Sequence, residues 1–362
     1  MIEASAPGKL FVAGEYAVVE PGGSAILVAV DRFVRVSGLD AEAGSVRSSH
    51  YGAEPRPWGA EVHDVVSAAI EVVGSLARDH GRTPRPLALT IDSGLDDADG
   101  SKYGLGSSAA VVVAIVRVLA EANDVPLDAQ TTLRLALLAT WAVNPAASGG
   151  DVAASALGGW IRYRSADAAE LLDRRERFGV AEALAGEWGS LAATALPAPE
   201  GEPLLVGWTG SPASTAALVG RSRQERAVRD ADYRAFFAES DAAVADLGAA
   251  IARGDDDARA SGIRRARAAL AHYATLTGIE IETPALTELC AIAERHGAPA
   301  KSSGAGGGDC GIALAGRSVD RERLRAEWLA ADIRPLDLRA WPHATTTTEA
   351  PTGAAATPRR TP

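Results

Sequence analysis

Residues 102–122, KYGLGSSAAVVVAIVRVLAEA, join a glycine-rich start to an apolar stretch long enough for a helix. A helix that is apolar on nearly all sides must be covered on all sides, so this stretch belongs in the interior. Its start leaves backbone N–H groups and the positive end of the helix dipole available to an anion. The segment therefore predicts a buried helix whose N-terminus faces a binding site.

Composition excludes several classes of protein. Hydrophobic residues make up 47% and charged residues 23% of the 362 residues, as in a globular protein long enough for two domains. The net charge of −11 argues against a general nucleic-acid-binding protein. The N-terminal residues lack the pattern of a signal peptide, and the apolar stretch at 109–120 is too short for a membrane span and contains Arg117. With only two cysteines, a disulfide framework is also excluded, and we expect a cytoplasmic protein that binds neither membranes nor nucleic acid.

The chain divides at residues 197–203, PAPEGEP, where proline and glycine preclude regular structure. We predict an N-terminal domain at 1–196 and an α+β C-terminal domain at 204–342. The remaining residues, 343–362, are rich in Thr, Ala and Pro and predict a disordered tail with a solvated His343. The expected strands are 34–40, 87–92, 159–164, 204–209 and 310–315, and the expected helices are 61–79, 106–122, 128–143, 222–253, 257–277, 284–296 and 319–329.

Lysine is rare in this chain, and its positions are informative. Of 36 basic residues only Lys9, Lys102 and Lys301 are lysines, and each lies beside a glycine-rich segment. Elsewhere the chain uses arginine for positive charge, whereas lysine is a compact point charge that fits among phosphate oxygens. The lysines are therefore candidates for a phosphate site, with chance retention as the alternative.

The glycine-rich start at 103–110 is interpreted as a phosphate cradle. Glycines allow a ligand to approach the backbone, and the hydroxyls of Ser107 and Ser108 can bind phosphate oxygens or a magnesium ion. The alternative is an ordinary serine-capped helix, which would not need two glycines and a preceding lysine. The segment GLGSSA also fits a loose dinucleotide-binding pattern, but no expected strand directly precedes it, so an NAD-dependent enzyme is not supported.

Two further segments are candidates for the same site. Residues 301–309, KSSGAGGGD, carry glycines that are costly to order, as expected where backbone presses against a ligand; a flexible hinge is the alternative. Asp151 follows the glycines of SGGD and is either a turn or N-cap residue or a catalytic carboxylate, and the local sequence leaves both open.

Three of these segments together resemble the GHMP kinases, a family that includes galactokinase, homoserine kinase, mevalonate kinase and phosphomevalonate kinase. The resemblance rests on APGKLFVAGEYAVV at 6–19, KYGLGSSAAV at 102–111 and KSSGAGGGDCGIAL at 301–314, whose order and spacing cover most of the chain. Within the family, GEYAVVEPG at 14–22 and GWTGSPAST at 207–215 are most similar to the bacterial phosphomevalonate kinase branch.

The resemblance implies an α+β, two-domain GHMP kinase fold, with an S5-domain-2-like N-terminal domain, a ferredoxin-like C-terminal domain and the active site between them. It implies ATP and Mg²⁺ as cofactors and 5-phosphomevalonate as the small-molecule substrate, converted to the diphosphate in the mevalonate route to isoprenoids. The positions that match the family's catalytic residues are Lys9 and Asp151. Those that match the ATP cradle are Gly104, Leu105, Gly106, Ser107 and Ser108, with Ser108 near the metal. Those that match the acceptor pocket are Glu15, Tyr16, Lys102, Ser148, Ser214, Thr215, Ser302, Ser303 and Gly304.

One position departs from the family's pattern. Several members carry a metal-binding glutamate eleven residues before the aspartate, and this chain has Thr140 there. Water molecules or another acid are therefore expected to complete the magnesium shell. The oligomeric state, monomer or homodimer, is left open.

The chemistry of the acceptor agrees with the lysines. A phosphate monoester has a second pKa of about 6, so it is mostly dianionic at neutral pH. The site must then offset repulsion between two anions and align them, and a base is less important than for an alcohol acceptor. Lysines in all three motifs suit that task, and Asp151 is expected to orient Lys9. The alternatives are mevalonate kinase or another GHMP small-molecule kinase, and a non-catalytic ligand-binding regulator with the same fold.

Overall fold

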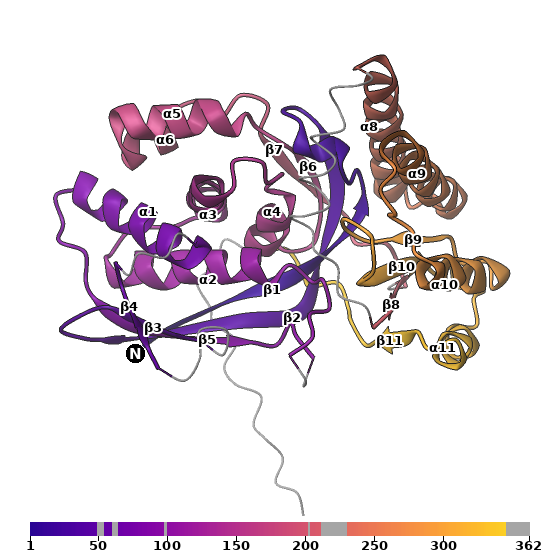
Figure 1. The fold of residues 1–362 in the computed structure, drawn as a ribbon, viewed down its shortest axis with the longest axis horizontal. Helices are drawn as coiled ribbons and strands as arrows, with labels where there is room; N and C mark the ends of the chain where they lie inside the picture. The colour runs from indigo at the N-terminus through magenta and orange to yellow at the C-terminus, as the bar shows by residue number, and fades with distance from the viewer. Residues whose placement is uncertain (49–53, 60–63, 98–99, 202, 211–229, 345–362) are drawn as a thin grey trace, which may run out of the picture.

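The computed structural model describes residues 1–48, 54–59, 64–97, 100–201, 203–210 and 230–344. Two long strands, β1 (Ile2–Ala13) and β2 (Ser24–Asp40), pair antiparallel at the centre of the N-terminal domain (Figure 1). The pairing shifts register between Pro7 and Gly8, which marks a bulge just before Lys9.

Shorter strands extend this sheet in the order β4-β3-β5-β2-β6-β7, with β1 paired to β2 off this path. Their bounds are Ser45–Ser48 for β3, Arg56–Pro57 for β4, Leu87–Ser93 for β5, Trp160–Arg164 for β6 and Ala192–Leu196 for β7. The helices of this domain are η1 (Ala17–Val19), α1 (Val65–Asp79), α2 (Ser107–Ala122), α3 (Ala129–Val143), α4 (Gly150–Leu157), α5 (Ala168–Phe178) and α6 (Val180–Ala185).

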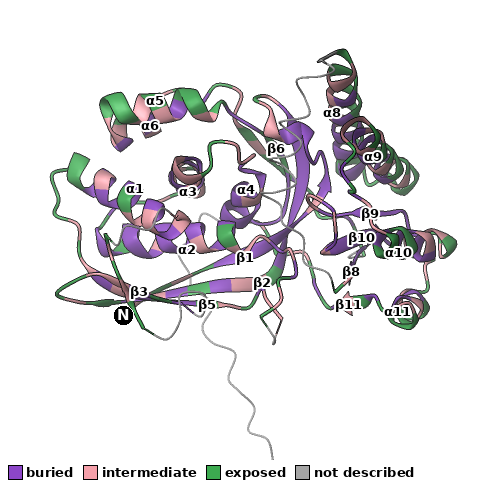
Figure 2. Ribbon diagram, in the orientation of Figure 1, coloured by how far each residue is buried: buried purple, intermediate pink, exposed green. Residues whose placement is uncertain are grey.

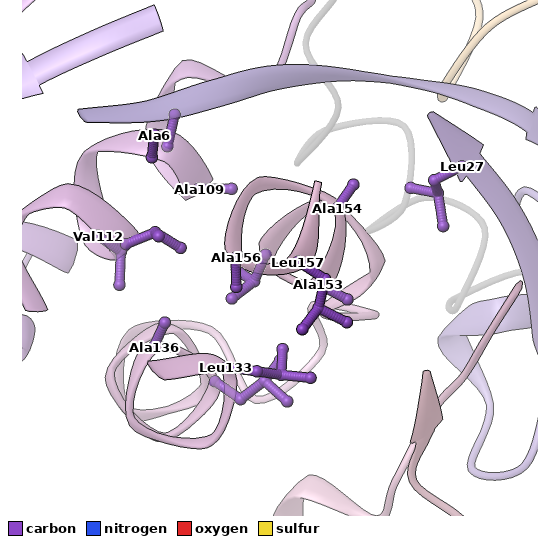
Figure 3. Close-up of a cluster of buried hydrophobic side chains, with 14 of the residues drawn as sticks. Ala6, Leu27, Ala109, Val112, Leu133, Ala136, Ala153, Ala154, Ala156 and Leu157 are labelled. Carbon is purple, nitrogen blue, oxygen red and sulfur yellow. The ribbon is translucent and has the colours of Figure 1, made fainter. Parts of the chain in front are cut away.

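The expected buried helix is α2, which packs against β1 and β2 on one side and α1, α3 and α4 on the other. Figure 2 shows helix α2 as predominantly buried. Alanines allow close packing here: Figure 3 shows Ala153, Ala154 and Ala156 of α4 among side chains of α2, α3 and the sheet. The positions of α2 and α4 matter for function because each N-terminus carries predicted site residues.

The C-terminal domain is built on an antiparallel sheet in the order β11-β8-β10-β9. Its elements are β8 (Leu204–Trp208), α8 (Asp230–Arg253), α9 (Asp256–Thr277), α10 (Pro284–Arg295), β9 (Ala300–Ser302), β10 (Cys310–Leu314), α11 (Arg321–Ala330) and β11 (Arg334–Leu336). The α+β fold in two domains is thereby confirmed. Within the part of the chain that the structure describes, no helix has the length and apolar character needed to cross a bilayer.

The end of the described chain crosses back to the N-terminal domain, which corrects the expectation of a tail with a solvated His343. Trp341 N donates to Ala29 O at 2.8 Å, and Ala344 N donates to Leu157 O at 2.8 Å. The His343 ring lies 3.2 Å from Leu196 O and is only partly exposed. The partners of these residues are backbone groups of the N-terminal domain that are distant in sequence, so the composition of residues 343–362 could not predict the contacts. Residues 345–362 lie outside the described chain.

Candidate active site

A cavity of about 860 Å³ lies where the two domains meet. The N-terminal domain contributes the end of β1, the first turn of α2 and the loop before α4, and the C-terminal domain contributes the glycine-rich loop after β9. Most of the predicted site residues line it: Lys9, Glu15, Tyr16, Lys102, Gly104, Leu105, Gly106, Ser107, Ser108, Ser148, Asp151, Ser303 and Gly304. Segments that are distant in sequence therefore meet at one site.

The predicted phosphate cradle is an N-terminal helix turn with glycines that tolerate no side chain. Gly106 is the N-cap of α2 with φ +78°, and a Cβ there would lie 2.7 Å from Lys9 Cε. Gly104 has φ +77°, and a Cβ there would lie 2.6 Å from Asp309 Cγ. Both glycines are thus required by backbone conformation and by close approach. The first N–H groups of α2 have no acceptor within the helix and point out of its N-terminus. They are therefore available to bind an anion.

Lys9 is held tightly against this cradle. It is 7% exposed; its N–H donates to Leu105 O at 2.9 Å, and its Nζ donates to Gly104 O at 3.3 Å. The ammonium group also lies 5.4 Å from the ring centroid of Phe11. These contacts place a positive charge beside the N-terminus of α2, so two sources of positive potential act on the same part of the cavity.

Asp151 lies in the first turn of α4, where its Oδ1 accepts a hydrogen bond from Val152 N at 2.9 Å. Although Asp151 and Lys9 line the same cavity, they form no ion pair within 4 Å, so the expected direct orientation of Lys9 by Asp151 is absent from this structure. The preceding loop is fixed by Tyr163, whose hydroxyl donates to Ser148 O at 2.8 Å. Burial, and secondarily the charge of Asp151, raises the pKa of Tyr163, so its hydroxyl remains a donor.

Lys301 does not line the cavity, so the expectation that all three lysines form the phosphate site is wrong for this residue. It is completely buried, and its Nζ donates to Glu15 Oε1 and to Ser302 O. Glu15 belongs to the N-terminal domain and is 4% exposed, so the pair is a buried ion pair between domains. The charge of Lys301 is used to neutralise Glu15, and the lysines that line the cavity are Lys9 and Lys102.

The glycine-rich loop after β9 is anchored to the N-terminal domain. Ser303 Oγ donates to Phe11 O at 2.9 Å, and Gly304 N donates to Glu15 Oε1 at 3.4 Å. Tyr16 Oη donates to Ala305 O at 2.5 Å. These bonds argue against the hinge alternative and fix the domain contact at the cavity wall. Ser302, predicted for the acceptor pocket, is buried in β9 and does not line the cavity, while Ser214 and Thr215 lie outside the described residues.

Several cavity residues were not predicted from the sequence. Phe11, Asp96, Asn144 and Asp309 line the cavity together with Thr140. Asp309 has φ +53°, a conformation that non-glycine residues seldom adopt, and it sits against Gly104. Its place at the end of the glycine run was the available signal, whereas Asp96 and Asn144 lie in ordinary loop sequence.

The residues present fit a magnesium ion that arrives with a phosphorylated ligand. No group of three or more His, Cys, Asp and Glu side chains able to hold a metal exists among the described residues. Mg²⁺ commonly takes few protein ligands and completes its shell with phosphate oxygens and water. Thr140 Oγ1 is buried without a hydrogen-bond partner at the cavity, which offers a polar atom to bound water or ligand but no carboxylate.

Comparison with known proteins covers both domains. The family model for the GHMP kinases N terminal domain matches residues 65–159, and that for the GHMP kinases C terminal matches residues 249–333. A phosphomevalonate kinase from Streptomyces sp. (strain CL190) is 43% identical over 357 residues, which cover 92% of this chain and 95% of that protein.

Solved structures give the same result. A Lin0012 protein from Listeria innocua superposes with a TM-score of 0.88 at 32% identity, covering 95% of this chain and 98% of that chain. A phosphomevalonate kinase from Streptococcus pneumoniae, solved in complex with phosphomevalonate and AMPPNP, superposes with a TM-score of 0.84 at 27% identity, covering 94% and 100%.

Proposed function

Because the chain belongs to the GHMP kinase family, we propose that it transfers the γ-phosphoryl group of ATP to the phosphate of 5-phosphomevalonate, giving 5-diphosphomevalonate and ADP. The observation that carries this proposal is the placement of Lys9 and Lys102 at one cavity beside the N-terminus of α2. In a chain of net charge −11 with only three lysines, the placement of two ammonium groups at one cavity suits a site where two anions must meet. We also propose a cytoplasmic location, in keeping with free, buried Cys290 and Cys310.

The cradle and the first turn of α2 would bind the phosphates of ATP through backbone N–H groups and the hydroxyls of Ser107 and Ser108. Ser108 would hold Mg²⁺ together with phosphate oxygens. The ion supplies charge neutralisation on the nucleotide phosphates when it is bound. The glycines of the cradle exclude side chains from this volume, so the ligand can approach the backbone directly.

The acceptor would lie against Lys102, Ser148, Ser303 and Gly304, on the side of the cavity shared by both domains. A phosphate oxygen of the acceptor forms the new bond to the γ-phosphorus. The bond between the γ-phosphorus and the β,γ-bridging oxygen of ATP breaks, and that oxygen leaves with ADP. Lys9 would stabilise charge on the transferred group, because its Nζ lies at the cradle. The dianionic acceptor needs no base, so Asp151 would act through the electric field of its charge, held in place by the hydrogen bond from Val152 N in the first turn of α4.

Release of ADP, coupled to a reporter enzyme, tests this proposal with phosphomevalonate, mevalonate, homoserine and galactose as separate acceptors. We expect rapid turnover with phosphomevalonate and background rates with the others, because Lys102 and Lys9 favour a dianion over a neutral hydroxyl group. Preferred turnover of mevalonate would retain the family and reject the phosphate acceptor. Binding of ATP without turnover of any acceptor would instead support a non-catalytic regulator.

A further inference from the structure

Arg334 crosses from one domain to the other beside the proposed acceptor site. It begins β11 in the C-terminal domain, and its Nη1 donates to Asp97 Oδ2 at 2.7 Å. Its Nη2 donates to Asp97 Oδ1 at 3.2 Å and to Tyr103 Oη at 2.8 Å. Tyr103 Oη in turn donates to Asp97 Oδ1 at 2.8 Å. One planar guanidinium group thus binds two residues of the N-terminal domain with bidentate geometry.

Two aromatic rings lie close to the guanidinium group of Arg334. The guanidinium carbon of Arg334 lies 5.6 Å from the ring centroid of Tyr103 and 5.7 Å from that of Trp208. The two rings meet edge to face with their centroids 5.2 Å apart. Tyr103 is 2% exposed and the Asp97 side chain 16%, whereas the Arg334 side chain is 48% exposed, so solvent reaches the guanidinium group but much less of its two partners. Burial of the two partners strengthens their hydrogen bonds to the guanidinium group, and the rings add cation–π attraction.

The two residues that Arg334 binds, Asp97 and Tyr103, lie before and after Lys102 in the sequence. Lys102 directly precedes Tyr103, and its backbone forms a β-bridge with Asp96, next to Asp97. Asp97 N also donates to Ser101 O at 2.8 Å. Lys102 itself is exposed and reaches the cavity, so the place of its ammonium group depends on the backbone that carries it. Fixing Asp97 and Tyr103 therefore fixes the origin of the Lys102 side chain.

We propose that Arg334 is a positioning residue, which holds the loop around Lys102 from the opposite domain so that Lys102 meets the acceptor phosphate. The inference rests on the proposed function, because the role of Lys102 belongs to that proposal. The cradle for ATP has separate anchors: Lys9 N donates to Leu105 O at 2.9 Å, and Lys9 Nζ donates to Gly104 O at 3.3 Å. Loss of Arg334 is thus expected to affect the acceptor more than ATP.

Steady-state kinetics of Arg334→Ala test this role. We expect the KM for phosphomevalonate to rise about tenfold, which corresponds to about 1.4 kcal/mol, while the KM for ATP changes less than about threefold. Asp97→Ala should give a similar rise, and the double variant should add little to either, because both variants remove the same contact. A merely structural role would instead lower kcat through a smaller active fraction and leave both KM values unchanged.

Arg264→Ala is the matched control, because Arg264 also forms a bidentate pair, with Glu294, on the exposed side of the C-terminal domain. It should leave both KM values unchanged. An unchanged acceptor KM in Arg334→Ala would overturn the proposal.

Hydrogen exchange of the ligand-free enzyme separates this inference from the proposed function. Arg334→Ala should accelerate amide exchange in the peptide that covers residues 94–106, with little change at the control site around Glu294. If the unmodified protein fails to turn over phosphomevalonate, the proposed function is rejected, and exchange alone then decides whether Arg334 orders this loop. Unchanged exchange in that case rejects the positioning role as well.

Discussion

Replacement of Lys9 by methionine is expected to lower kcat by about a hundred- to a thousandfold. Methionine keeps the length of the side chain but removes the positive charge that donates to the cradle carbonyl of Gly104. That charge would be needed most when negative charge moves between the γ-phosphoryl group and ADP, so its loss should appear in kcat rather than in substrate binding. Initial rates with saturating ATP and phosphomevalonate measure the effect.

Two variants control this result. Arg78→Met removes a cation from an exposed ion pair with Glu71, away from the residues that line the cavity, and should retain full activity. Asp151→Asn should lose less activity than Lys9→Met, because the acceptor is already ionised and Asp151 makes no ion pair with Lys9. The assignment of roles is wrong if Asp151→Asn abolishes turnover and Lys9→Met leaves it nearly intact.

Replacement of Lys301 by methionine is expected to destabilise the protein by about 3–5 kcal/mol. The lysine is 0% exposed, and removing it leaves the buried carboxylate of Glu15 without its partner at the domain contact. An uncompensated buried charge costs far more than the lost attraction between exposed groups. Urea denaturation followed by tryptophan fluorescence measures the loss as a lower transition midpoint.

The double variant Glu15→Gln/Lys301→Met is the informative control for stability. Because it removes both charges, it should recover a large part of the lost stability relative to Lys301→Met alone. Arg177→Met breaks an exposed pair with Asp173 and should cost no more than about 1 kcal/mol. A loss of that small size in Lys301→Met would contradict the account of the buried pair.

The cradle could be predicted from sequence because its signature is local. Gly106, the serines and the apolar helix are consecutive, and their chemistry depends on a single turn of α2. The lysine argument succeeded in placing Lys9 and Lys102 at one cavity but failed for Lys301. Its neighbours in sequence are glycines, yet its partner, Glu15, is 286 residues away, and only the tertiary fold reveals that pair.

The missed elements have physical reasons of their own. Pro7 and Gly8 interrupt the residue pattern expected of a strand in β1. In the structure the strand continues through a bulge at these two residues, directly before Lys9. Helix α4 consists largely of small apolar residues, so it lacks the contrast between faces on which periodicity depends. Its identity as a helix follows from close packing against α2, α3 and β1, which the sequence alone does not show.

Contacts between the domains were the least predictable part of the site. Arg334 has no motif around it, and its partners Asp97 and Tyr103 precede it by more than 200 residues. The contacts of Trp341 and His343 likewise depend on backbone carbonyl groups of the N-terminal domain. Long-range pairs of this kind depend on how the two sheets are placed, which no local pattern determines.

Phosphorus NMR of the reaction product tests the central claim most directly, because it identifies the atom that receives the phosphoryl group. With phosphomevalonate and ATP, we predict a new pair of mutually coupled resonances from a diphosphate other than ADP, at the expense of the phosphomonoester signal. A second phosphomonoester resonance would mean transfer to a hydroxyl group, and inorganic phosphate alone would mean hydrolysis of ATP. Either result would contradict a site built around Lys9 and Lys102 for a phosphate acceptor.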